Sequence, residues 1–92
     1  MKAKRIVIAG RVHGVGYRDW LVAQAGAMGV SGWVRNRADG SVEALLQGPA
    51  VVVEELLRAC RRGPRAAHVE SIAEELTEEE AQPGFLRRPT LR

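Results

Sequence analysis

Hydrophobic residues recur along this 92-residue chain with two different periods. Residues 4–10 contain a short run of β-branched residues, which is typical of a strand buried on at least one face. From Tyr17 to about Met28, apolar residues are spaced by four, four and three positions, which predicts one buried face of a helix. Gly29 follows at the place where such a helix commonly ends.

The middle of the chain predicts a hairpin followed by a second helix. Residues 30–37 and 41–47 have the composition of strands, and Asp39-Gly40 between them is a strong turn pair. Gly48-Pro49 then breaks the chain, with the proline near the start of a helix that is expected to reach about Arg62. The residues expected along the buried side of this helix are Val52, Val53, Leu56, Leu57 and Cys60.

The last third of the chain completes the pattern. Residues 67–74 alternate enough for a strand, residues 78–84 predict an exposed turn, and residues 85–87 predict a short fifth strand. The order β-α-β-β-α-β is the split βαβ, or ferredoxin-like, plan of the α+β class. Residues 1–92 are therefore expected to form a single domain, a two-layer sandwich with two helices on one face of an antiparallel sheet.

Composition is that of a folded intracellular protein. The apolar fraction is 46%, yet no apolar run approaches the roughly 20 residues needed to span a bilayer. Cys60 is the single cysteine, so an intrachain disulfide is impossible and a cysteine-based metal site is not expected. A reducing cytoplasm is the expected location, with neither a metal nor a cofactor.

The net charge of +3 permits an anionic ligand without requiring nucleic acid. RNA-recognition domains share this order of elements, but they need exposed aromatic residues on their central strands. The first strand here offers only aliphatic residues, and the chain contains two tryptophans, one tyrosine and one phenylalanine in all. An RNA-binding module is therefore a weak alternative, and neither nucleic acid nor a membrane is expected as a partner.

Residues 10–18 have the features of an anion-binding loop. Their glycines permit left-handed backbone conformations and let backbone amides approach a ligand closely. The helix predicted directly after them adds unpaired N–H donors and the positive end of its dipole. Arg18 adds a permanently charged fork that matches phosphate or carboxylate oxygens. The candidate phosphate-binding residues are His13, Gly14, Val15, Gly16, Tyr17 and Arg18.

Two motifs, in this order, resemble those of the acylphosphatases, and the resemblance covers essentially the whole chain. Residues 8–18 resemble the family's phosphate-binding loop; residues 32–36, with residues 39–43 and Gly48, resemble its catalytic strand and hairpin. The resemblance implies an enzyme that hydrolyses acyl phosphates to a carboxylate and inorganic phosphate. It implies a small-molecule substrate, with inorganic phosphate as product and inhibitor, and we expect the chain to work as a monomer.

By this resemblance the catalytic residues are Arg18 and Asn36. Arg18 would hold the phosphoryl oxygens together with amides of residues 15–20, because the transferred group spreads its charge over several oxygens. Asn36 would orient the attacking water, since its amide can accept and donate but cannot ionise as a base. His13 is expected to hydrogen-bond within the loop rather than act as that base. What removes the proton from the water is left open.

The chain departs from the family's usual pattern at a few positions. His13 stands where glutamine is most frequent, and Tyr17 where phenylalanine is. Arg87 takes a position that is usually apolar, and Pro89 would interrupt pairing, which weighs against a regular last strand. A catalytically silent domain that binds phosphate is the other function these residues allow. All of the candidate groups address the phosphoryl end of a substrate, and none recognises the acyl group.

Overall fold

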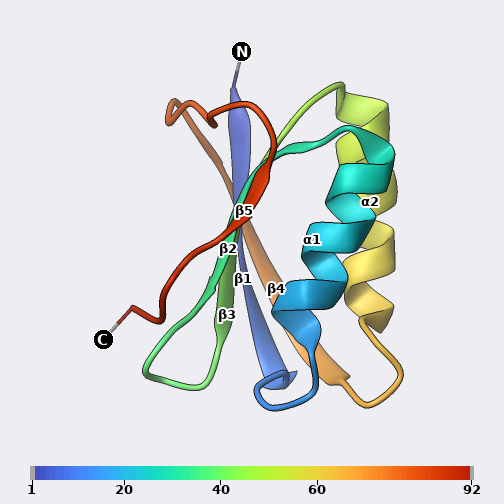
Figure 1. Cartoon of the computed structure of the whole chain (residues 1–92), viewed down its shortest axis with the longest axis vertical. Coiled ribbons are helices and arrows are strands. Elements are labelled where there is room, and N and C mark those ends of the chain that lie inside the picture. The colour runs from blue at the N-terminus through green and yellow to red at the C-terminus, as the bar shows by residue number, and fades with distance from the viewer. Residues whose placement is uncertain (1, 92) are drawn as a thin grey trace.

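The computed structural model describes residues 2–91, which form five strands and two helices in the predicted order (Figure 1). Their bounds are β1 Ala3–Arg11, α1 Tyr17–Met28, β2 Ser31–Asn36, β3 Val42–Gln47, α2 Ala50–Arg62, β4 His68–Thr77 and β5 Phe85–Arg87. Helix α1 has the bounds that the apolar spacing predicts, and Gly29 ends it in the left-handed conformation, with φ 71°.

The strands form one sheet in the order β4-β1-β3-β2-β5. Strand β1 lies between β3 and β4 and runs antiparallel to both, and β2 and β3 form the predicted hairpin. Strand β5 departs from the expected antiparallel sheet, because it pairs with β2 in parallel. The chain from β4 crosses back along one end of the sheet, so that β5 enters the edge in the direction of β2 (Figure 1). The ferredoxin-like α+β fold is confirmed.

Both helices pack on one face of the sheet, and the apolar core lies between the two layers (Figure 1). Alternate strand residues point into this core, because successive side chains of a strand face opposite sides. The most deeply buried core residues include Ile6, Ile8, Val34, Val42, Ala44, Leu46, Leu21, Leu56 and Cys60. Val52, expected in the buried row of α2, is only half-buried. Neither helix found within residues 2–91 is long and apolar enough to cross a membrane.

Strand β5 forms although an arginine occupies a usually apolar position. Phe85 packs against the core, and Arg87, two residues later on the same side of the strand, lies where its guanidinium reaches water. A long arginine stem can cover apolar surface while its charge stays solvated. The strand ends at Arg87, before Pro89, as expected for a residue that has no N–H to donate.

The helix-free face of the sheet is covered by charged and aromatic side chains. Glu43 is 3% exposed there and forms ion pairs with Nε of Arg5 at 3.1 Å and Nε of Arg35 at 2.7 Å. The guanidinium groups of Arg35 and Arg88 lie 4.6 and 4.7 Å from the centre of the Trp33 ring. Trp33 and Arg88 are therefore packing residues of this face and lie on the opposite side of the sheet from the helices.

Tyr17 joins the first turn of α1 to the last turn of α2. Its hydroxyl donates a buried hydrogen bond of 2.6 Å to the carbonyl oxygen of Cys60. That carbonyl is one of the last four of α2, which a helix leaves without an internal partner. Burial raises the pKa of the Tyr17 hydroxyl well above its usual 10.0, and burial raises the pKa of the Cys60 thiol from 9.0 to about 11. Both groups are therefore held in their neutral forms.

We expect the protein to lose stability steeply in alkaline solution. Folding raises both pKa values, so the neutral groups do not reduce the free energy of unfolding below pH 9.0. The free energy of unfolding then falls as the pH rises past 9.0 for Cys60 and past 10.0 for Tyr17, because the unfolded chain loses these protons first. Each group should lower the free energy of unfolding by about 1.4 kcal/mol per pH unit within its window. Urea unfolding at a series of pH values would measure this slope.

The single tyrosine offers an independent check of the same effect. Near-ultraviolet absorbance of tyrosinate should rise only as the chain unfolds, and Tyr17→Phe should remove the tyrosine part of the slope. The free energy of unfolding of the variant should also be lower by about 1 kcal/mol at neutral pH, because the Cys60 carbonyl loses its hydrogen-bond donor. Tyrosinate formation near pH 10 in a chain that is still folded would contradict the prediction.

Candidate active site

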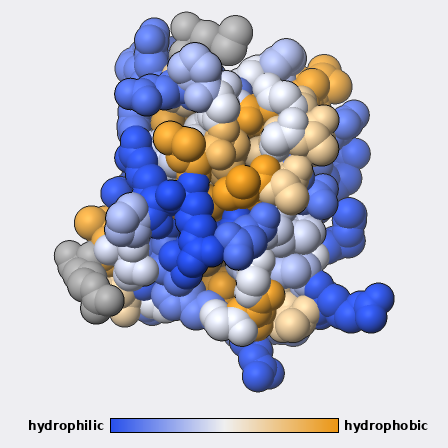
Figure 2. Space-filling model, viewed as in Figure 1, coloured by the Kyte–Doolittle hydropathy of each residue, from blue (hydrophilic) through white to orange (hydrophobic). Residues whose placement is uncertain are grey.

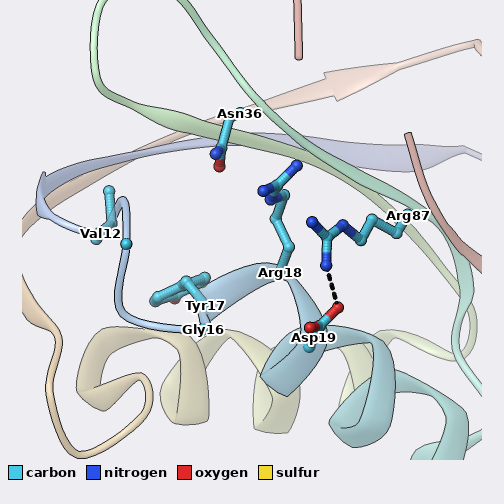
Figure 3. Close-up of a pocket in the computed structure, with 8 residues that line it drawn as sticks. Val12, Gly16, Tyr17, Arg18, Asp19, Asn36 and Arg87 are labelled. Atoms are coloured by element: carbon cyan, nitrogen blue, oxygen red, sulfur yellow. Dashed lines mark hydrogen bonds and ion pairs between the residues drawn. The ribbon is translucent and has the colours of Figure 1, made fainter. Parts of the chain in front are cut away.

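A pocket of about 220 Å³ opens where the glycine loop enters α1 (Figure 3). It is built by the loop, the first turn of α1, the end of β2 and the end of β5, which lie far apart in the sequence. The residues that line it are Val12, Gly14, Gly16, Tyr17, Arg18, Asp19, Asn36 and Arg87.

The glycine loop brings the N-terminal end of α1 to this pocket. Gly14 and Gly16 have φ of 69° and 77°, in the left-handed region that disfavours every side chain. Gly16 is the N-cap of α1, and its carbonyl accepts the first helical hydrogen bond, from the Trp20 N–H at 3.0 Å. No side chain among residues 2–91 caps the helix. The first N–H groups of α1 are therefore available to an anion, at the positive end of the helix dipole.

Arg18 places a half-buried guanidinium in the pocket (Figure 3). Within the described part of the chain, no hydrogen-bond acceptor or ion-pair partner contacts this guanidinium. Burial lowers the pKa of Arg18 and the nearby charge of Arg87 lowers it further, whereas Asp19 acts in the opposite direction. Arginine stays protonated nonetheless, so the lowered pKa indicates a positive charge that is incompletely compensated. Such a charge favours an anion in the pocket.

Asn36 ends β2 and directs its side-chain amide into the same pocket (Figure 3). Its backbone carbonyl accepts a hydrogen bond from the Leu91 N–H at 2.8 Å, which fixes this end of the strand. Among the described residues, no buried side-chain nitrogen or oxygen lacks a hydrogen-bond partner. The amide of Asn36 and the guanidinium of Arg18 thus face solvent within the pocket, where a ligand or a water can reach them.

The sequence predicted that His13 would hydrogen-bond within its own loop. The structure shows a hydrogen bond to the hairpin instead. Its Nε2 lies 2.8 Å from the carbonyl oxygen of Ser41, which can only accept, so Nε2 carries the proton and donates. The same carbonyl accepts the Arg37 N–H at 2.9 Å. Ser41 is in turn fixed by Asp39, whose Oδ1 accepts its N–H at 2.9 Å and its hydroxyl at 2.6 Å. His13 therefore ties the loop to the hairpin that carries Asn36.

The structure brings together only part of the predicted site. Five predicted residues line the pocket: Gly14, Gly16, Tyr17, Arg18 and Asn36. His13 and Val15 do not line it, and the Tyr17 hydroxyl turns away from it toward Cys60. Val12, Asp19 and Arg87 also line it, although they were not among the candidate site residues; Asp19 was expected only as one of the backbone amides of residues 15–20. The departure of Arg87 from an apolar pattern was the one sequence feature that could have drawn attention to it.

The donor set of this pocket suits an oxyanion. It consists of the guanidinium groups of Arg18 and Arg87, helix N–H groups and the neutral amide of Asn36, none of which is a base at neutral pH. The part of the chain that the structure describes contains no group of three or more His, Cys, Asp or Glu side chains arranged to hold a metal ion. The arrangement can therefore bind a tetrahedral anion and hold a water beside it by hydrogen bonds and charge.

Comparison with known proteins gives a consistent result. Residues 4–86 match the family model of the acylphosphatases. An acylphosphatase of Acidiphilium cryptum is 57% identical over 98% of this chain and 99% of its own, and one of Rhizorhabdus wittichii is 52% identical over 97% and 90%. The crystal structure of the acylphosphatase from Bacillus subtilis has a TM-score of 0.84 and 30% identity, and covers 100% of this chain and 99% of its own.

Proposed function

This chain belongs to the acylphosphatase family, and from that premise we propose that it hydrolyses acyl phosphates in the pocket at the start of α1. The products are a carboxylate and inorganic phosphate. The observation that carries the proposal is the meeting of an unpaired guanidinium, uncapped helix N–H groups and the Asn36 amide in one pocket. The substrate is a small molecule, and we propose a monomer as the working unit.

Arg18 and the first N–H groups of α1 bind the phosphoryl group. The carboxylate of an acyl phosphate is a good leaving group, so the protein needs to supply positioning and charge stabilisation rather than a covalent intermediate. Charge in the transition state spreads over the equatorial oxygens of the transferring group. A guanidinium fork and several fixed N–H donors match that distribution of charge. Partial burial of Arg18 strengthens the electrostatic attraction between its guanidinium and the phosphoryl oxygens.

Asn36 orients the water that attacks phosphorus. Its carbonyl oxygen accepts one proton of the water, and its amino group donates to a phosphoryl oxygen, so that the water is held beside the group it attacks. The new P–O bond forms to this water, and the acyl carboxylate departs with the electrons of the P–O bond that breaks. Neither Asn36 nor Arg18 can take the proton, so it passes to the phosphate product or to solvent.

Hydrolysis of benzoyl phosphate by the purified chain tests the proposal. We expect turnover that EDTA leaves unchanged, since no step needs a metal. Inorganic phosphate should raise KM and leave kcat unchanged, because it competes for the same donors. A folded protein that binds phosphate but shows no turnover would contradict the enzyme and favour the catalytically silent phosphate-binding domain.

A further inference from the structure

A second arginine, Arg87, reaches the pocket from the opposite end of the chain. Strand β5 pairs with β2 so that Arg87 lies opposite Val34, a core residue, which places it on the helix-covered side of the sheet. Its guanidinium lies beside that of Arg18 in the close-up view (Figure 3). Figure 2 shows a band of strongly hydrophilic residues across the middle of this face, where β5 crosses in Figure 1.

Asp19 contacts Arg87 through one hydrogen bond and leaves much of the guanidinium exposed to water. Asp19 Oδ1 accepts a hydrogen bond from Nη1 of Arg87 at 2.5 Å. The two side chains are 72% and 46% exposed, so water screens the pair and its net attraction is small. The guanidinium has further N–H donors that this contact does not use. These donors remain available to a ligand that enters beside Arg18.

The pocket extends beyond the residues assigned to the phosphoryl group and reaches Arg87. Its volume of about 220 Å³ is several times the space of one water molecule, about 30 Å³. Arg18 and the helix N–H groups already provide the donors that a phosphoryl group needs. Arg87 lies on the other side of Arg18 from the glycine loop (Figure 3), so it can contact a part of the substrate that extends beyond the phosphoryl group.

We propose that Arg87 recognises a second anionic group on the acyl part of the substrate, which makes acyl phosphates of polyanionic acids the preferred class. A carboxylate or a phosphate on the acyl group carries the charge that a half-exposed guanidinium binds, and the contact with Asp19 leaves other N–H donors of the fork unused. Arg87 is in this sense a specificity-determining residue. The inference rests on the proposed hydrolysis of acyl phosphates.

Four rigid substrates test it: 3- and 4-carboxybenzoyl phosphate and their neutral 3- and 4-carbamoyl counterparts. The second carboxylate in these compounds cannot attack the anhydride, and its two positions sample two directions of approach. The carbamoyl group withdraws more electron density, so leaving-group chemistry favours the neutral members of each pair. We expect kcat/KM for at least one carboxylated substrate to exceed that of its carbamoyl partner roughly five- to tenfold, mainly through a lower KM.

Arg87→Gln should abolish that preference, and Arg87→Lys should restore part of it, because lysine keeps the charge and loses the fork. Arg88→Gln is the matched control, since Arg88 is the next residue and packs on Trp33 across the sheet. It should leave the preference unchanged. Raised salt should weaken the preference in the wild type. Thermal unfolding of each variant separates these effects from loss of the fold.

The outcomes distinguish this inference from the proposed function. Hydrolysis of all four substrates without a charge preference, or a preference that survives Arg87→Gln, would overturn the role of Arg87 and leave the hydrolase intact. If Arg87→Gln lowers kcat/KM equally for charged and neutral substrates, Arg87 acts on the phosphoryl group, and its proposed role in recognising the acyl part is also overturned. Absence of any turnover, with benzoyl phosphate as well, would overturn the proposed function and the inference together.

Discussion

Replacing Arg18 by alanine is expected to lower kcat/KM for benzoyl phosphate about 1,000-fold. The guanidinium is half-buried, faces the pocket, and has no acceptor among residues 2–91, so its charge is available to the phosphoryl oxygens. Its removal takes away the charged donor beside the uncapped start of α1 that has no carboxylate partner in the described chain, since Arg87 is paired with Asp19. Phosphate affinity should fall together with turnover, because the ground state and the transition state share these oxygens.

Two further variants make the result specific to Arg18. Arg58→Ala removes an exposed arginine of α2 that does not line the pocket, and it should leave kcat/KM unchanged. Arg18→Lys keeps a point charge without the planar fork and should recover only part of the activity. Initial rates, phosphate titration calorimetry and circular dichroism would be measured for all three. A loss below about tenfold in folded Arg18→Ala would remove Arg18 from the assigned role.

Replacing Asn36 by alanine is expected to lower kcat about 100- to 1,000-fold while phosphate still binds. The amide lies at the end of β2, beside Arg18 and apart from the N–H groups of α1 that bind the phosphoryl group. Its loss should leave the anion held but the water without a fixed direction of attack. Single-turnover rates and phosphate titration would separate the two effects.

A charged replacement gives the complementary test. Asn36→Asp keeps the size of the side chain but adds a negative charge that repels the phosphoryl group, so phosphate binding should fall as well as turnover. Gln82→Ala, at an exposed residue between β4 and β5, is the control and should behave as the wild type. Full turnover in Asn36→Ala would show that another group positions the water, and it would contradict the mechanism proposed above.

Most of the fold could be predicted because each element carries its own local pattern. The spacing of apolar residues gave α1 its bounds, and Asp39-Gly40 gave the hairpin its turn. The direction of β5 could not be predicted in this way. It depends on how residues 78–84 cross the end of the sheet, and no residue there specifies parallel over antiparallel pairing.

The site could be predicted where its residues are neighbours in sequence or belong to a recognisable motif. Gly14, Gly16 and Arg18 fall within one loop and helix start, and Asn36 lies in the second motif. The partner of His13 could not be foreseen, because Ser41 lies 28 positions away and offers only a backbone carbonyl. Arg87 is 68 positions from its partner Asp19, and only the pairing of β5 with β2 brings it to the pocket.

The N-cap of helix α1 is a glycine, Gly16, and no side chain in the described chain bonds to the first N–H groups of the helix. Under the proposed function, a bound phosphate supplies the missing cap, so the free energy of binding adds to the free energy of folding. Each tenfold rise in phosphate above its dissociation constant then stabilises the folded chain by about 1.4 kcal/mol. That is a substantial fraction of the 5–15 kcal/mol, roughly, by which domains are stable. The concentration of phosphate in the surrounding solution thereby becomes one of the quantities that determine how much of the chain is folded.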